Sequence, residues 1–168
     1  MRIRTTTAVT IASALLLLPA CGRKAAENAM EQQIRQETGG DADVDMNADG
    51  SMQVTTKDGT YNAGNNQLPE DWPTDAPIYA GAKIQFSGSA NGTTGKPGSA
   101  AVLTTSDSAA DVVTYYKAEL AKQGWTISST MEAQGTSIFG ATKGTRALSL
   151  LIGSAEGQTS ITIGIGEQ

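Results

Sequence analysis

Residues 109–125, which read AADVVTYYKAELAKQGW, decide the fold that the sequence predicts. Apolar and aromatic side chains recur there at the i, i+4, i+7, i+11 spacing of one helical face. They are Ala109, Val113, Tyr116 and Leu120. Ser108 stands three residues before Asp111, which suits an N-terminal cap, and Gly124 followed by Trp125 suits a C-terminal cap with its hydrophobic contact. The stretch therefore predicts a capped helix with one apolar face.

Short strands are predicted on both sides of this helix, whose body we expect over residues 111–123. Alternating apolar and polar residues mark two segments before it and four after it. The predicted strands cover residues 83–89, 99–105, 125–130, 136–142, 145–152 and 159–165. In the last of them, isoleucines alternate with small or polar residues, as in a sheet with one buried face. We expect an α+β fold: an antiparallel sheet of about five or six short strands packed on one helix.

A short helix and a β-hairpin are predicted before this domain. Residues 23–37 are helix formers with a narrow apolar stripe, and glycines 39 and 40 follow them. The stripe consists of Ala26, Met30 and Ile34. Because it is narrow, the sequence leaves open whether this helix docks on the domain or serves as a spacer. Residues 43–60 have a period of two around a polar turn, which predicts the hairpin.

The chain is thus divided into four expected regions. They are a signal peptide over 1–20, a lipidated anchor and helical spacer over 21–40, a β-hairpin and linker over 41–66, and the α+β domain over 67–168. The domain begins with residues 68–79, where prolines 69, 73 and 77 favour an extended course over the surface. Trp72 and Tyr79 are the candidate surface-recognition side chains of this segment, and an aromatic groove would require Tyr115 to converge with them.

Three motifs of the domain resemble a group of uncharacterised exported bacterial lipoproteins. The motifs are LPEDWP over 68–73 with PIYAGA over 77–82, VVTYYKAEL over 112–120, and the Gly124-Trp125 pair. They cover roughly the last hundred residues and are of the kind that fix a fold. The resemblance implies a location and an architecture, and it implies no established activity.

The amino terminus predicts export. Residues 1–7 carry two arginines and no acid, and residues 8–18 form an apolar run that is far shorter than the ~20 residues needed to span a bilayer. Together with a small-residue cleavage site, this pattern is typical of a secretory signal. The sequence Leu18-Pro19-Ala20-Cys21 resembles a lipoprotein lipobox, apart from the proline. The resemblance implies cleavage between Ala20 and Cys21, a diacylglyceryl thioether on Cys21 and acylation of the new amino terminus.

Composition excludes several chemistries. The 168 residues carry 12 basic and 17 acidic side chains, a net charge of −5. Removal of residues 1–20 takes away two arginines and no acid, so the net charge becomes −7. An acidic chain without a basic run lacks the footprint of a nucleic-acid binder. With no histidine, and with Cys21 as the single cysteine, Ser-His-Asp, Cys-His and zinc-hydrolase sites are excluded. We therefore expect no enzyme, and no cofactor beyond the covalent lipid.

The tip of the predicted hairpin contains a motif that partly matches a calcium-binding loop. Asp45, Asn47 and Asp49 match oxygen-ligand positions of a calcium-binding loop, and Gly50 matches its glycine. The bidentate acid that such a loop needs at its twelfth position is replaced by Thr56. Since a hairpin tip with acids on its wet side explains the same residues, we expect no calcium and no other metal.

These observations favour a membrane-anchored bacterial lipoprotein that acts as a non-catalytic binding or structural module of the cell envelope. Its expected partners are the membrane, through the acyl chains, and an envelope protein of unknown identity. We expect it to face the periplasm or the cell exterior. If the cell has two membranes, the outer membrane is favoured, because Gly22 rather than aspartate follows Cys21. Two alternatives stay open: a carrier or sensor of a small amphiphilic ligand, and an enzyme that works without histidine or cysteine.

Overall fold

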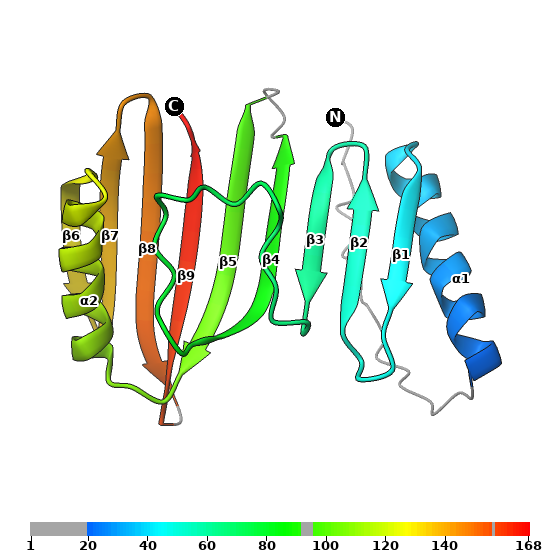
Figure 1. The fold of residues 1–168 in the computed structure, drawn as a ribbon, viewed down its shortest axis with the longest axis horizontal. Helices are drawn as coiled ribbons and strands as arrows, with labels where there is room; N and C mark the ends of the chain where they lie inside the picture. The colour runs from blue at the N-terminus through cyan, green and yellow to red at the C-terminus, as the bar shows by residue number, and fades with distance from the viewer. Residues whose placement is uncertain (1–19, 92–95, 156) are drawn as a thin grey trace, which may run out of the picture.

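The computed structural model describes residues 20–91, 96–155 and 157–168, which form one antiparallel sheet of nine strands and two helices (Figure 1). The helices are α1 (Ala20–Thr38) and α2 (Ala109–Lys122). The strands are β1 (Ala42–Met46), β2 (Met52–Thr56), β3 (Gly59–Ala63), β4 (Lys83–Asn91), β5 (Pro97–Thr105), β6 (Thr126–Ala133), β7 (Thr136–Lys143), β8 (Arg146–Ala155) and β9 (Gln158–Glu167). Their order across the sheet is β1-β2-β3-β4-β5-β9-β8-β7-β6.

The expectation of a sheet of five or six strands is wrong. The predicted hairpin forms as β1 and β2, but β3 follows it and pairs with both β2 and β4, so all nine strands belong to one sheet. The sequence hides β3 because its inward side chain is polar. Asn62 is 2% exposed, accepts a hydrogen bond from Gln53 at 2.8 Å and donates one to Ser87 at 3.4 Å. Paired amides thus replace the apolar alternation that marks a strand.

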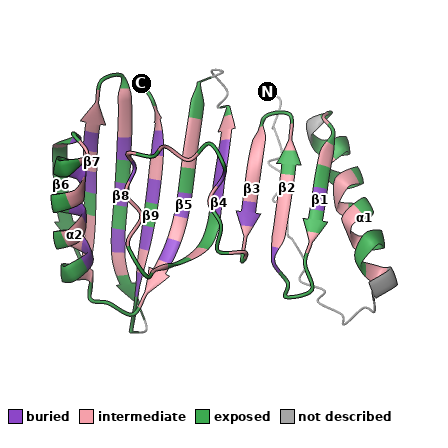
Figure 2. Cartoon of the chain, in the orientation of Figure 1, coloured by how far each residue is buried: buried purple, intermediate pink, exposed green. Residues whose placement is uncertain are grey.

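One face of the sheet, which we call the covered face, packs against α2. Its large apolar side chains come from alternate positions of the central strands and are almost fully buried (Figure 2). They include Leu103, Phe139, Leu148, Leu150, Ile152, Ile161 and Ile163. We call the opposite side of β4 to β9 the open face. Burial of one such side chain contributes about 1.5–3 kcal/mol, so this layer is the main stabilising feature of the fold.

Helix α2 forms with the predicted caps and with a face displaced by one residue. The Ser108 hydroxyl accepts a hydrogen bond from the Asp111 backbone N–H. Gly124 has a φ of 79°, and the Trp125 N–H donates to the Leu120 carbonyl at 2.9 Å, as in a Schellman cap. The fully buried side chains are Val112, Tyr116 and Leu120, whereas the predicted Ala109 and Val113 lie at the partly buried margin. Val112 replaces Val113 because it lies four residues from Tyr116 and eight from Leu120, on the line that faces the sheet.

Residues 64–82 run in front of the covered face without regular structure (Figure 1). An ion cluster holds this segment to the sheet. Asp75 accepts hydrogen bonds from Lys143 at 2.6 Å and from Arg146 Nη1 at 3.0 Å, and its backbone carbonyl accepts one from the Trp125 indole at 2.7 Å. The Arg146 guanidinium also lies 5.1 Å from the centre of the Trp125 ring. The segment contains no helix, as the prolines predict, but its course is not extended throughout: backbone hydrogen bonds from Ala76 to Pro73 and from Ala82 to Tyr79 close turns in it.

Helix α1 lies beside the edge strand β1 (Figure 1), which answers the question that the narrow apolar stripe left open. Two carboxylates of the helix take the place of a further strand. Glu31 accepts the Val44 N–H at 3.2 Å, and Glu27 accepts the Met46 N–H at 3.0 Å. Four helical residues rise about 6 Å and two strand residues about 6.7 Å, so the two spacings match. In the described part of the chain, neither helix combines the length and the apolar character needed to cross a bilayer.

Candidate ligand groove

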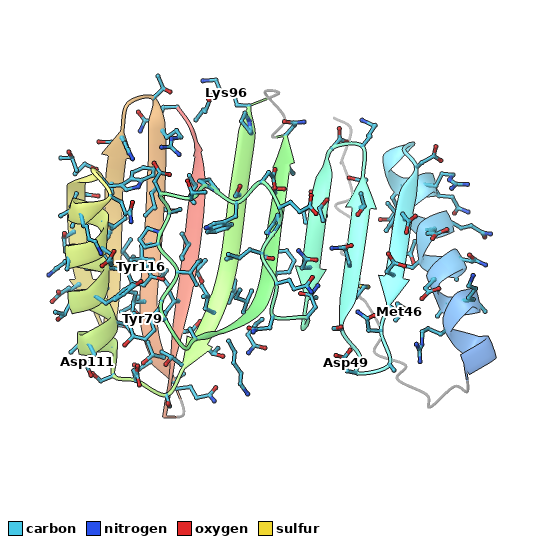
Figure 3. The ribbon with its side chains drawn as sticks, viewed as in Figure 1. Met46, Asp49, Tyr79, Lys96, Asp111 and Tyr116 are labelled. Carbon is cyan, nitrogen blue, oxygen red and sulfur yellow. The ribbon has the colours of Figure 1, made fainter. Side chains whose placement is uncertain are left out.

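A groove separates the N-terminal half of α2 from the end of the β6–β7 hairpin. Its volume is about 530 Å³. Its lining residues are Ala109, Ala110, Val113 and Thr114 from the helix, and Glu132, Ala133, Gln134, Gly135, Thr136 and Ser137 from the hairpin. We call this the α2–hairpin groove. Asp111, labelled in Figure 3, marks the helix end beside it.

The groove exists because the first turn of α2 carries small side chains. Ala109 and Ala110 present only a methyl group each, whereas Tyr116 and Leu120 fill the space between the other half of the helix and the sheet. Val113 is partly buried against the core and closes the inner side of the groove. The floor is therefore apolar, and the buried layer behind it is filled by side chains.

Polar groups surround this floor. Thr114 is already engaged, because its hydroxyl donates to the Ala110 carbonyl at 2.8 Å. Glu132, Gln134 and Ser137 provide a carboxylate, an amide and a hydroxyl on the hairpin side. An apolar floor with a few polar groups on the rim is the usual arrangement of a site that binds a small molecule with an apolar part.

The tip of the hairpin adds backbone strain at the rim. Gln134 has a φ of 50° and Gly135 a φ of 78°, in a two-residue connection between the paired residues Ala133 and Thr136. Such a turn favours asparagine or glycine at its first position, and a side chain such as glutamine there costs about 1–2 kcal/mol. Strained positions of this kind cluster at binding sites, which is a second reason to consider the groove functional.

A larger groove of about 600 Å³ lies on another part of the surface and is less suited to an amphiphile. Polar side chains and backbone from β2, β3 and residues 67–71 supply most of its lining. Leu68, Pro69 and Ala90 are its main apolar contributors, and Pro69 is itself buried. This groove lacks a continuous apolar floor, so the α2–hairpin groove is the better candidate.

The predicted recognition residues Trp72 and Tyr79 do not form an open aromatic groove together. Tyr79 contacts Tyr115 edge-on, with 4.9 Å between ring centres, and Tyr115 contacts Tyr116 in the same way at 5.2 Å. Trp72 is half-buried, packs against the core and donates its indole N–H to the Ala76 carbonyl at 3.2 Å. The structure thus brings Tyr79 to Tyr115, and it gives Trp72 a packing role in its own segment.

The tyrosine hydroxyls are engaged in holding residues 64–82 against α2. The Tyr79 hydroxyl donates to Asp107 at 2.8 Å, the Tyr115 hydroxyl donates to the Ile78 carbonyl at 2.8 Å, and the Tyr116 hydroxyl accepts the Tyr79 N–H at 3.2 Å. The hydrogen bond to Asp107 raises the pKa of Tyr79, and burial raises the pKa of Tyr116. Both hydroxyls therefore stay protonated and act as structural hydrogen-bonding groups.

The three residues considered for calcium lie at the β1–β2 hairpin. Asn47 donates its amide to Ser51 at 2.9 Å, and Asp49 accepts the Ser51 N–H at 3.0 Å, a hydrogen bond that lowers the pKa of Asp49. Turn chemistry thus accounts for Asn47 and Asp49, while Asp45 is an exposed residue of β1. Within the residues that the structure describes, no cluster of three or more metal-binding side chains occurs. That these residues bind no calcium stays a prediction.

The predicted lipidation site lies at the margin of the described chain. Residues 1–19, which contain most of the expected signal peptide, fall outside the described residues, as does the side chain of Cys21. The backbone of Ala20 and Cys21 belongs to the first turn of α1. Cleavage and lipidation therefore remain predictions.

The amino-acid sequence alone did not predict the α2–hairpin groove. Two local signals were present: adjacent alanines directly after a helix cap, and a Gln-Gly turn that joins two strands. Neither signal reveals that the two elements face each other, since residues 110 and 134 meet only through tertiary packing.

Comparison with known proteins gives one finding. A START domain-like family model matches residues 85–160, which is less than half of the chain. The matched residues run from β4 to the beginning of β9 and include α2 and both sides of the α2–hairpin groove. Searches of curated proteins and of solved structures gave no match.

Proposed function

We propose that this protein is a non-catalytic binding module that holds the apolar part of an amphiphile in the α2–hairpin groove. The observation that carries the proposal is a groove of ligand size between a helix and a sheet, within the part of the chain that resembles a START-like domain. START-like domains are generally binding modules. The likeness favours the carrier or sensor alternative over a purely structural role.

The chemistry of the groove suits a single-chain amphiphile. Pockets for small molecules usually measure about 300–1,000 Å³, and the volume of about 530 Å³ falls in this range. Each methylene group buried on the floor formed by Ala109, Ala110 and Val113 would contribute about 0.8 kcal/mol. The polar head would lie at the rim, where Gln134 and Ser137 offer hydrogen bonds. Because Glu132 is also there, a neutral or cationic head is favoured over an anionic one.

Two further parts of the proposal rest on the sequence. The absence of histidine and the single cysteine support a module without catalysis. The lipobox-like residues 18–21 support a lipid on Cys21 that holds the module at the membrane, facing the periplasm or the cell exterior. A tethered binding module of this kind would meet amphiphiles at the bilayer surface.

Fluorescence anisotropy with a labelled lysophosphatidylcholine, kept below its critical micelle concentration, tests the groove. Ala110→Trp places an indole over the floor, and Ala118→Trp places the same indole two turns further along α2, where Ala118 is exposed. We expect saturable binding to the wild type and to Ala118→Trp, and at least about tenfold weaker binding to Ala110→Trp.

Two results would count against the proposal. If the wild type shows no saturable binding, the amphiphile is not the ligand. If both tryptophan variants bind the probe as the wild type does, the ligand occupies another surface and the groove assignment fails.

A further inference from the structure

The open face of the sheet carries almost no charge. Strand register places the side chains of β4 to β9 alternately on the covered and the open face. Among the described strand residues of the open face, Lys83, at one corner, is the single charged residue. In the whole sequence, by contrast, 17% of the residues are charged. The acidic and basic side chains of β6 to β9, such as Glu132 and Arg146, lie on the covered face. A surface so depleted in charge can be desolvated at little electrostatic cost.

A ridge of large apolar side chains crosses this face at right angles to the strands. The register aligns six residues in one row: Phe86, Val102, Thr162, Leu151, Ile138 and Met131. Four of them are the large apolar residues that stand out as exposed in the described chain. Phe86 is 40% exposed, Leu151 41%, Ile138 38% and Met131 61%. A β-bulge between Ile84 and Phe86 turns Phe86 to this side, while Ile84 packs against the core.

A trough of small residues lies beside the ridge, two residues along each strand. The register aligns Gly88, Ala100, Gly164, Ser149, Gly140 and Ser129; the Tyr61 ring of β3 covers Gly88, so the open part of the trough begins at Ala100. A groove of about 480 Å³ follows part of this row. A Cβ atom on Gly140 would come within 2.5 Å of the Ser129 hydroxyl, so a substitution of Gly140 would displace the neighbouring Ser129 side chain. Ridge and trough are about 6.7 Å apart, the rise of two strand residues.

From this arrangement we infer that two copies of the chain pack face to face through their open faces. A two-fold axis parallel to the rows, midway between ridge and trough, places the ridge of each copy over the trough of the other. A surface that is complementary to itself in this way is what an isologous dimer requires. The sheets would pack about 10 Å apart, as in a β-sandwich, with the best contact near the central strands β8 and β9.

The size of the face also favours a second copy. Six strands spaced about 4.8 Å apart and eight residues of about 3.4 Å each give a footprint of roughly 29 by 27 Å. This is close to the ~800 Å² per partner that a stable protein–protein interface buries. A bilayer surface fits this face less well. Anionic membranes attract clusters of basic residues, whereas the described strand residues of the open face include one cation, Lys83, and the chain as a whole is acidic. The dimer does not depend on the α2–hairpin groove, which lies on the other side of the sheet.

Cross-linking with a thiol-specific bifunctional reagent tests the dimer in membranes from cells that express the full chain. The reagent has an arm of about 5 Å, because sheets about 10 Å apart are too distant for a direct disulfide. The proposed axis places Leu151 of one copy directly opposite Ser149 of the other. Two Ser149 or two Leu151 residues are in addition displaced from each other by about 6.7 Å along the strand. We therefore expect a cross-linked band at about twice the mass of the single chain when a Ser149→Cys chain and a Leu151→Cys chain are expressed together. Either variant alone, and the parent with Cys21, should give at least about tenfold less.

Further substitutions show whether the band comes from this interface. Ile138→Lys puts a charge in the ridge and should abolish the band, while Ala118→Lys on the exposed side of α2 should leave it unchanged. If the Ile138→Lys chain does not accumulate, Met131→Lys replaces it, since Met131 is the most exposed ridge residue. No band on co-expression, equal bands from the single variants, a band that survives the ridge charge, or a band at the mass of another protein would each overturn the second-copy proposal.

Discussion

Asp75 shows how one residue can hold an irregular segment in place. Its carboxylate binds Lys143 and Arg146, and its backbone carbonyl binds Trp125, so residues far apart in sequence meet at one point. The hydrogen bond from Arg146 is the main cause that lowers the pKa of Asp75 from 3.8 to about 2, with Lys143 adding to it. Without this anchor, the irregular residues 64–82 would be held in place by packing and by the tyrosine hydroxyls.

The lowered pKa predicts how stability depends on pH. A carboxyl whose pKa is lower in the folded state stabilises the fold above pH 3.8, and this contribution is lost as the pH falls towards about 2. The shift corresponds to about 2 kcal/mol, which solvent screening of a carboxylate that is 20% exposed reduces to about 1 kcal/mol. Asp75→Asn should therefore lower the free energy of unfolding at pH 6 by about 1 kcal/mol or more, and the difference from wild type should shrink below pH 4.

Urea unfolding at several pH values measures this difference. Asp71→Asn is the matched control, because Asp71 is an exposed aspartate of the same segment. A difference that stays constant from pH 6 to pH 2 would show that Asp75 acts through its shape rather than its charge.

At the scale of elements, local signals predicted most of the C-terminal half. All six strands expected around α2 form, and both caps of α2 occupy the predicted residues. The predicted apolar face of α2 differs from the observed one by one residue, because Val112 and Val113 are adjacent and equally apolar. Periodicity alone could not decide which of them faces the sheet.

The buried face of α2 predicts a clear difference between two of its side chains. Leu120 is completely buried, so Leu120→Ala should lower the free energy of unfolding by about 2–5 kcal/mol through lost burial and a residual cavity. Lys117 is exposed and its ammonium lies 5.4 Å from the centre of the Phe139 ring, a contact of small energy in water. Lys117→Ala should therefore change the value by no more than about 0.5 kcal/mol. Equal effects in urea unfolding would mean that α2 docks through another face.

The α1–β1 contact predicts a change in hydrogen exchange. Glu27 and Glu31 accept N–H groups of β1 that point away from the sheet, so Glu27→Ala/Glu31→Ala removes both acceptors. A hydrogen bond to a charged group is worth about 1.5–3 kcal/mol, so the amides of Val44 and Met46 should exchange about tenfold faster or more.

The amides of Asp43 and Asp45 alternate with these two, point towards β2 and should keep their slow exchange. Glu37→Ala is the control in the same helix, because Glu37 bonds to Gln33 within α1. Unchanged exchange at Val44 and Met46 in the double variant would show that packing, and not the carboxylates, protects the edge of the sheet.

At the scale of the whole molecule, the sequence could not predict how far the sheet extends. A strand such as β3 is stabilised by its neighbours, through Asn62, Gln53 and Ser87, and polar pairs of this kind leave no apolar period to detect. The α2–hairpin groove was hidden for a related reason, since Ala110 and Gln134 lie on separate elements whose distance depends on the packing of Tyr116 and Leu120. Long-range pairing decided both features.

Lipidation of Cys21 is the prediction that concerns the molecule as a whole, because a lipid there would hold the α2–hairpin groove and the open face close to the membrane. If Cys21 carries two or more acyl chains, each buried methylene contributes about 0.8 kcal/mol and attachment to the membrane is stable. Intact-mass measurement of the wild type should then show a chain that begins at Cys21 and carries the mass of the lipid. Cys21→Ser should leave the protein unprocessed or fully released from membranes. Ser108→Ala, which removes a helix cap far from the amino terminus, should be processed and lipidated as the wild type is. A mature chain that begins at Cys21 without acyl chains would mean that an ordinary signal peptidase removes residues 1–20, and the tether would have to be abandoned.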